Sequence, residues 1–189
     1  EKITVYGDYD ADGITSTSEM YETLLNIGAN VEFFVPNRFT DGYGPNPDVY
    51  KRIINEGTTL IVTVDNGISG NEAIDVANKM NCDVIITDHH QLPEKLPNAY
   101  AIVHARYPGH EYPFGEFSGV GVAFKVATAL LGELPEEYFD LAAIGTIADI
   151  VSLTDENRVL VKFGLKMIEN TERPGLASLA KLAGLKGEL

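Results

Sequence analysis

A short apolar run at residues 3–6 is followed at once by three aspartates at alternate positions: Asp8, Asp10 and Asp12. The run is typical of a buried strand, and a helical pattern begins around Thr15 or Ser16, either of which could cap a helix. Carboxylates this close together repel one another unless a positive charge lies between them. A divalent cation with oxygen ligands is one such charge. An acidic turn in solvent is the alternative, and the rest of the chain favours the metal.

Strand-like and helix-like stretches alternate along most of the chain. The short apolar runs that read as strands are residues 3–6, 31–35, 60–64, 83–87 and 101–103. The stretches with helical spacing are residues 18–27, 48–55, 71–80, 122–131, 136–147, 159–170 and 176–183. This alternation predicts an α/β fold with a mainly parallel, Rossmann-like sheet flanked by helices, followed by a helical C-terminal part.

The composition is that of an ordinary globular chain. With 189 residues, of which 44% are hydrophobic, it can bury a core as one domain. The longest apolar runs fall well short of the ~20 residues that a membrane span needs. One cysteine, Cys82, excludes an internal disulfide and suits a reducing compartment. Because the chain opens directly on a strand, we expect no signal peptide and a cytoplasmic location.

The chain is strongly acidic. Its net charge is −14, from 28 acidic and 14 basic residues. A broad electropositive surface for nucleic acid is therefore not expected on this stretch. A phosphate-containing substrate stays possible, because bound cations can reverse the local sign of the charge.

Carboxylates follow three separate predicted strands. Asp8, Asp65 and Asp88 each come directly after an apolar run, or one residue later. In an open parallel sheet the carboxyl ends of the strands share one edge, and ligands bind in the crevice there. Turn chemistry alone accounts for one or two such acids, and Asn66-Gly67 after Asp65 is certainly a turn. Three of them indicate a functional site.

Two adjacent histidines, His89 and His90, follow Asp88. A lone histidine is more often structural than a ligand. Here one imidazole can bind a metal while a carboxylate orients its neighbour, and the other can contact a phosphate oxygen or act as a general acid. Asp149 ends an apolar helical stretch, where an acid is costly unless it is paired or bound to a cation. Asp149 therefore joins the candidate metal ligands, with a local hydrogen bond as the alternative.

Other residues carry weaker signals. The segment Ser118-Gly119-Val120-Gly121 precedes a helical stretch and could offer backbone N–H groups to a phosphate, although close helix packing explains the glycines equally well. In the loop rich in glycine and proline, Arg38 and Tyr43 could contact a phosphate and a base, or be ordinary loop residues. His104 and His110 have no evident partners, and we interpret both as incidental.

Four segments, residues 7–13, 64–67, 87–90 and 145–149, resemble in order the four motifs of the DHH phosphoesterase superfamily. The first begins with Tyr6-Gly7 rather than with the histidine of family II pyrophosphatases and nanoRNases. In this respect the chain resembles the bacterial exonucleases that degrade single-stranded DNA from 5′ to 3′. Residues 38–44, 118–125 and 156–158 share the same likeness.

The resemblance implies metal-dependent phosphodiester hydrolysis with Mn²⁺ or Mg²⁺, and two ions in the complete enzyme. One ion would be held by Asp12, Asp65, His89 and Asp149. The second would be held by Asp10 and Asp65, with Asp8 completing or orienting that shell. Asp88 would support a histidine, and His90 would contact the scissile phosphate, so Asp8, Asp88 and His90 count as catalytic. The expected substrate-binding residues are Arg38, Tyr43, Ser118, Gly119, Gly121 and Arg158.

By the same resemblance, residues 1–164 form the catalytic domain and residues 165–189 begin a helical connection to further domains that this sequence lacks. Single-stranded DNA is the expected partner, in DNA repair and recombination, and single-strand-binding protein is a candidate. A small-molecule phosphohydrolase of the superfamily, acting on oligoribonucleotides, cyclic dinucleotides or pyrophosphate, is the alternative. A non-catalytic module is disfavoured, because every expected metal-binding acid and histidine is present.

Overall fold

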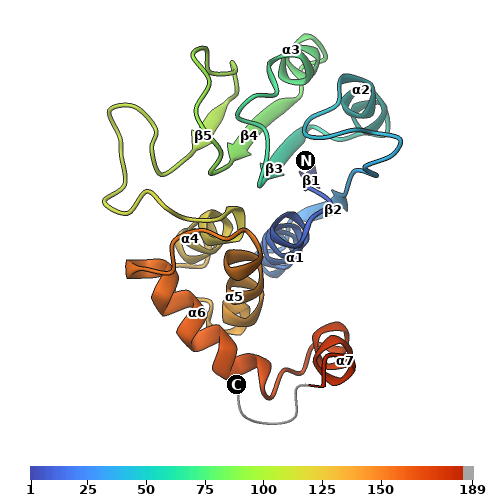
Figure 1. Cartoon of the computed structure of the whole chain (residues 1–189). Coiled ribbons are helices and arrows are strands. Elements are labelled where there is room, and N and C mark those ends of the chain that lie inside the picture. Colours follow the sequence, from blue (N-terminus) through green and yellow to red (C-terminus); the bar gives the residue numbers. More distant parts are fainter. Residues whose placement is uncertain (185–189) are drawn as a thin grey trace.

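The computed structural model describes residues 1–184. Five strands form one parallel sheet in the order β2-β1-β3-β4-β5 (Figure 1). The strands are β1 (Lys2–Tyr6), β2 (Asn30–Phe34), β3 (Leu60–Val64), β4 (Asp83–Thr87) and β5 (Ala101–Val103). The helices are α1 (Ala11–Asn26), α2 (Pro47–Asn55), α3 (Asn71–Lys79), α4 (Gly119–Leu131), the 3₁₀ helix η1 (Glu136–Tyr138), α5 (Phe139–Ala148), α6 (Asp155–Ile168) and α7 (Pro174–Leu182). The predicted α/β class, parallel sheet and helical C-terminal part are confirmed.

Helices cover both faces of the sheet, which is why its central strands are apolar on both sides. Figure 1 shows α2 and α3 on one face, α1 and α4 on the other, and α5 and α6 beyond α1 and α4. Successive strand residues point to opposite faces. Tyr6 accordingly packs with α2 and α3, in a cluster that includes Tyr50 and Ile74. Val5 packs with Met20 of α1 on the other face.

The first helix begins four residues earlier than the sequence pattern predicts. Its N-cap is Asp10, whose Oδ1 accepts a hydrogen bond from the Gly13 amide at 2.8 Å. An aspartate is a good N-cap and an acid in the first turn is favourable beside the helix dipole. The expectation of Thr15 or Ser16 as the cap is therefore wrong. As a result, Asp12 lies inside the first turn of α1, on a rigid element.

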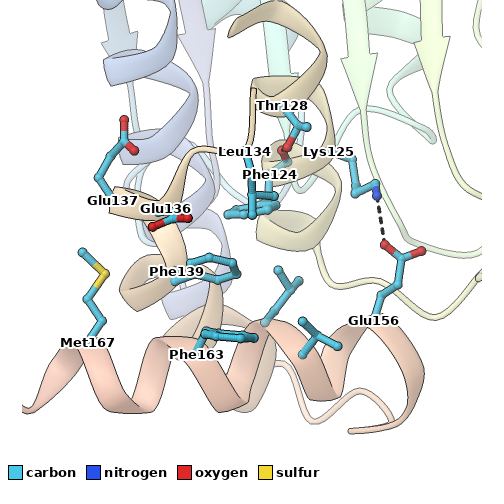
Figure 2. Close-up of a pocket in the computed structure, with 12 residues that line it drawn as sticks. Phe124, Lys125, Thr128, Leu134, Glu136, Glu137, Phe139, Glu156, Phe163 and Met167 are labelled. Carbon is cyan, nitrogen blue, oxygen red and sulfur yellow. Dashed lines mark hydrogen bonds and ion pairs between the residues drawn. The ribbon is translucent and has the colours of Figure 1, made fainter. Parts of the chain in front are cut away.

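The C-terminal helices form a second packed layer. Phe124 of α4, Phe139 of α5 and Phe163 of α6 stack in sequence, with ring centroids 5.1 and 5.4 Å apart, and they line an apolar groove (Figure 2). Arg173, before α7, pairs with Glu22 of α1 at 2.8 Å and with Asp140 of α5 at 3.3 Å. These ion pairs fix the start of α7 against the rest of the fold.

The expected division of the chain at residue 164 falls within α6, and it stays a prediction. The last part of the expected connection, residues 185–189, lies outside the described residues. Within residues 1–184, we find no helix that combines the length and the apolar character needed to cross a membrane.

We expect Gly164→Ala to lower the free energy of unfolding by about 1–3 kcal/mol, because it overpacks the contact between α5 and α6. A Cβ at Gly164 would lie 2.9 Å from the carbonyl carbon of Phe139 and closer still to its oxygen. Gly175→Ala in α7 is the matched control, since no heavy atom lies within 4 Å of a Cβ there. Denaturant unfolding measures both variants, and equal stabilities would contradict the tight α5–α6 contact.

Candidate active site

The carboxyl-terminal edge of the sheet gathers the predicted acids. Asp8, Asp65 and Asp88 follow β1, β3 and β4, and each is buried. Asp12 comes from the first turn of α1, and Asp149 is the C-cap of α5. The fold thus brings together side chains that are far apart in the sequence, as the strand-end argument predicts.

His89 lies at the centre of this cluster. Its Nε2 is 3.1 Å from Asp65 Oδ1, 3.7 Å from Asp149 Oδ2 and 3.8 Å from Asp12 Oδ2. Despite this proximity, Nε2 of His89 and Oδ1 of Asp65 are buried and have no hydrogen-bond partner of acceptable geometry among the described residues. Buried polar atoms are nearly always satisfied. Two buried, unsatisfied polar atoms that converge on one point fit a cation site.

The donor set fits a hard or borderline divalent cation. Two groups of side chains have ligand atoms within 4.8 Å of one another: Asp12, His89 and Asp149, and Asp65, His89 and His90. Carboxylate oxygens with an imidazole suit Mn²⁺ or Mg²⁺ better than a thiolate-preferring metal. The residues present are therefore suited to hold the metal that the sequence implies.

Two backbone amides at the start of α4 hold Asp12 in place. Gly119 N donates to Asp12 Oδ2 at 2.6 Å, and Val120 N donates to Oδ1 at 2.9 Å. Position 119 requires glycine, because a Cβ there would lie 2.5 Å from the Cβ of Asp65. The next free amide, that of Gly121, bonds the Ser118 hydroxyl at 3.3 Å. In this structure these three amides bind protein groups. A phosphate contact at this helix N-terminus is one of the two explanations that the sequence leaves open, and it stays a prediction.

Asp65 occupies a backbone conformation that few residues adopt. Its φ is +59°, in the left-handed region, where aspartate and asparagine are better tolerated than most other residues. Gly67, two residues later, also has a positive φ, of +111°. Strained backbone of this kind is concentrated at functional sites.

A second group of bonds surrounds His90. Its Nδ1 lies 2.7 Å from Asp88 Oδ1, and its Nε2 lies 3.0 Å from the Tyr43 hydroxyl. Asp88 Oδ1 also accepts from the amides of His89 and His90, and Oδ2 accepts from the Ile68 amide. Asp88 thus orients both histidines, while Tyr43 comes from the loop that the sequence singled out.

The two residues of this pair have opposite pKa shifts. The hydrogen bond to Asp88 raises the pKa of His90 to about 9. Burial alone would raise the pKa of Asp88, but hydrogen bonds from His90 and the Ile68 amide hold it below its usual value. His90 is therefore an imidazolium at neutral pH, and it is a positive charge beside an acidic cluster.

The carboxylates of the cluster shift the other way. Burial, followed by repulsion from Asp10, raises the pKa of Asp65 to about 8. Burial and repulsion from Asp65 raise the pKa of Asp12 to about 8 as well. Burial also raises the pKa values of Asp8 and Asp149. When no cation is bound, these carboxylates therefore bind protons more readily than free aspartates do.

The remaining predicted residues lie farther from the centre. Asp10 is exposed and caps α1. Arg38 stacks over the Tyr9 ring at 5.2 Å, and Tyr9 meets Tyr43 edge-on with ring centroids 6.5 Å apart. Arg158 is exposed near the start of α6. The structure thus connects Arg38 to Tyr43 through the Tyr9 ring, and the predicted substrate contacts stay predictions.

One residue that the sequence analysis set aside has hydrogen-bond partners beside the site. His104 is buried, with Nε2 2.8 Å from the carbonyl oxygen of His90 and Nδ1 accepting from the Arg106 amide at 3.0 Å. The expectation that His104 has no partners is therefore wrong. Only its position directly after a strand, on the same edge as the aspartates, could have revealed it.

We expect the metal-free protein to lose thermal stability as the pH rises from about 5.5 to about 8.5. Asp12 and Asp65 keep protons up to pH 8, whereas in the unfolded chain they ionise near pH 3.8. His90 acts in the same direction, because its pKa rises from 6.5 to about 9 on folding. In each case the native state binds more protons than the unfolded state, so rising pH favours unfolding.

Thermal unfolding in a chelator at both pH values is the measurement, and a buffer containing Mn²⁺ is the control. A bound cation favours the ionised carboxylates, so the loss should shrink when the ion is present. A melting temperature that rises with pH in the chelator would contradict the raised pKa values of Asp12, Asp65 and His90 in the native state.

Comparison with known proteins agrees with this geometry. The chain is 55% identical over 184 residues to the single-stranded-DNA-specific exonuclease RecJ of Bacillus subtilis, covering 97% of this chain and 23% of that protein. A crystal structure of exonuclease RecJ bound to manganese matches with a TM-score of 0.88 and 38% identity, covering 99% of this chain and 49% of that one. RecJ of Thermus thermophilus in complex with Mg²⁺ matches with a TM-score of 0.66 and 36% identity, covering 99% of this chain and 24% of that one.

The chain thus spans about a quarter of the length of its Bacillus subtilis relative. Residues 2–146 match the DHH family, N-terminal domain, which is well over half of the sequence. The four ordered motifs had suggested this family, and the resemblance is confirmed. The chain belongs to the DHH family.

Proposed function

We propose that this chain is the metal-dependent hydrolytic core of a single-stranded-DNA-specific 5′→3′ exonuclease. The proposal rests on two buried atoms at the carboxyl-terminal edge of the parallel sheet. His89 Nε2 and Asp65 Oδ1 lie 3.1 Å apart, and neither has a hydrogen-bond partner among the described residues. Support for the substrate comes from the RecJ relatives, which are described as specific for single-stranded DNA. Support for the ion comes from RecJ structures that contain manganese or Mg²⁺.

In this proposal the cluster holds Mn²⁺ or Mg²⁺, and two ions in the complete enzyme. Asp12, Asp65, His89 and Asp149 would hold one ion. Asp10 and Asp65 would hold the other, and Asp8 would bind it or orient the residues that do. When bound, the cations polarise a phosphoryl oxygen and lower the pKa of a water molecule.

His90 has a separate role. Asp88 keeps its imidazole charged through the 2.7 Å bond to Nδ1, so Nε2 also carries a hydrogen and can donate it. That Nε2 lies 3.0 Å from the exposed Tyr43 side chain, which a phosphate oxygen could displace. His90 would then stabilise the negative charge that develops on the phosphoryl oxygens during hydrolysis.

We propose that binding of the DNA strand depends on other residues than hydrolysis does. Arg38 and Tyr43 would contact the strand at the mouth of the site, with Ser118, Gly119, Gly121 and Arg158 as further candidates. A charge of −14 leaves few cations to neutralise phosphates. We therefore propose that further domains supply most of the affinity, and that residues 165–189 lead towards them. The complete protein would act in the cytoplasm in repair and recombination, with single-strand-binding protein as a partner.

We expect Asp65→Asn to abolish detectable Mn²⁺ binding in calorimetry and to remove phosphodiesterase activity. Asparagine tolerates the left-handed backbone at this position but lacks the negative charge, so the fold should survive. Asp75→Asn, which removes an exposed charge on α3, is the matched control. If Asp65→Asn keeps the affinity of the parent chain, Asp65 is not a ligand.

We expect the Mn²⁺-loaded chain to degrade 5′-labelled single-stranded DNA slowly and without processivity, and to bind it weakly with a shallow salt dependence. The reason is that a chain with a net charge of −14 neutralises few phosphates. Product sizing and a salt titration of binding are the measurements. Faster hydrolysis of dinucleotides or pyrophosphate than of DNA would favour the small-molecule phosphohydrolase. Tight binding with a steep salt dependence would contradict the proposal that further domains supply most of the affinity for DNA.

A further inference from the structure

His104 is buried outside the carboxylate cluster, and both of its ring nitrogens are hydrogen-bonded. Nε2 faces the carbonyl oxygen of His90 at 2.8 Å, and Nδ1 faces the amide nitrogen of Arg106 at 3.0 Å. A carbonyl can only accept and a backbone amide can only donate. Nε2 must therefore carry the hydrogen and Nδ1 must be bare. The surroundings hold the ring as one neutral tautomer.

The carbonyl that His104 binds belongs to the segment that carries both histidines of the site. Residues 88–90 lie beyond the end of β4 and outside regular secondary structure. Asp88 Oδ1 holds this segment by its amides, at 2.7 Å from His89 N and 3.0 Å from His90 N. His104 holds the same segment by a carbonyl. Together these three hydrogen bonds leave the peptide planes little freedom to rotate, and so they set the directions of both imidazoles.

We propose that His104 is a positioning residue, which orients His89 towards the metal ligands and His90 towards the phosphate through the His90 carbonyl. The inference rests on the proposed function. Without the Nε2–H donor, a buried carbonyl loses its partner and the segment can turn. Mutating a group that hydrogen-bonds to the residues around a metal typically lowers metal affinity or activity by about 10–100-fold.

Packing is the competing explanation for this residue. His104 also lines an apolar cavity with Ile102, Tyr107, Phe117 and Val122. If filling that space were its only task, an apolar side chain of similar length would serve as well as histidine. The two explanations therefore differ in whether a hydrogen-bond donor is needed.

His104→Gln and His104→Met are a matched pair that separates them. The glutamine amide nitrogen reaches about as far as Nε2 of histidine, whereas methionine fills the same space without a donor. The readouts are Mn²⁺ affinity by calorimetry, kcat on bis-p-nitrophenyl phosphate, and melting temperature. We expect His104→Met to lose about 10–100-fold in affinity or kcat while keeping its melting temperature. His104→Gln should stay within about threefold of the parent chain.

Equal affinity and kcat in the two variants would overturn the proposal, as would losses that simply follow the melting temperatures. A parent chain that binds no Mn²⁺ would refute the proposed function instead. In that case the metal-free protein still tests His104 by NMR. The His90 Nδ1–H···Asp88 proton should be observed in the parent chain and in His104→Gln, and lost in His104→Met. Its survival in His104→Met would overturn the positioning role.

Discussion

Mutual repulsion among buried carboxylates is the constraint on which the rest of the structure depends. Asp8, Asp12, Asp65 and Asp88 are all 2% exposed or less, on neighbouring elements at one edge of the sheet. Burial without compensation would be prohibitive for four ionised acids. Asp88 is compensated within the protein, by four hydrogen bonds that include one from the His90 side chain. Asp12 and Asp65 are not fully compensated, and their raised pKa values express the missing positive charge.

The same constraint explains why the helical layer packs so closely on the site. Asp12 draws both of its hydrogen bonds from the first amides of α4, and this fixes α1 against α4. A Cβ at Gly145 of α5 would lie 2.6 Å from Asp12 Oδ1, so α5 can approach only because that position is glycine. Asp149 at the end of α5 is thereby delivered to His89. Helices α4 and α5 are therefore part of the site rather than a cover for it.

Much of this could be predicted from the sequence, because the signals are local. Apolar runs that end in Asp8, Asp65 and Asp88 predicted both the parallel sheet and the edge at which the acids gather. The start of α1 was harder to predict, because an aspartate at position 10 could be either a helix N-cap or a metal ligand. Thr15 and Ser16, further along the chain, are also plausible N-caps. Partners that lie far away in the sequence were also missed. The bonds of Asp12 to α4 and of His104 to His90 span 107 and 14 residues, and no periodicity encodes them.

The central claim is that the space between His89 and the acids is a cation site. Anomalous diffraction from crystals grown with Mn²⁺, recorded at the manganese edge, tests it most directly. The account predicts an anomalous peak in contact with both His89 Nε2 and Asp65 Oδ1, with Asp12 and Asp149 on the same ion. Crystals that contain Mn²⁺ but show no peak there, with His89 and Asp65 still in direct contact, would contradict it.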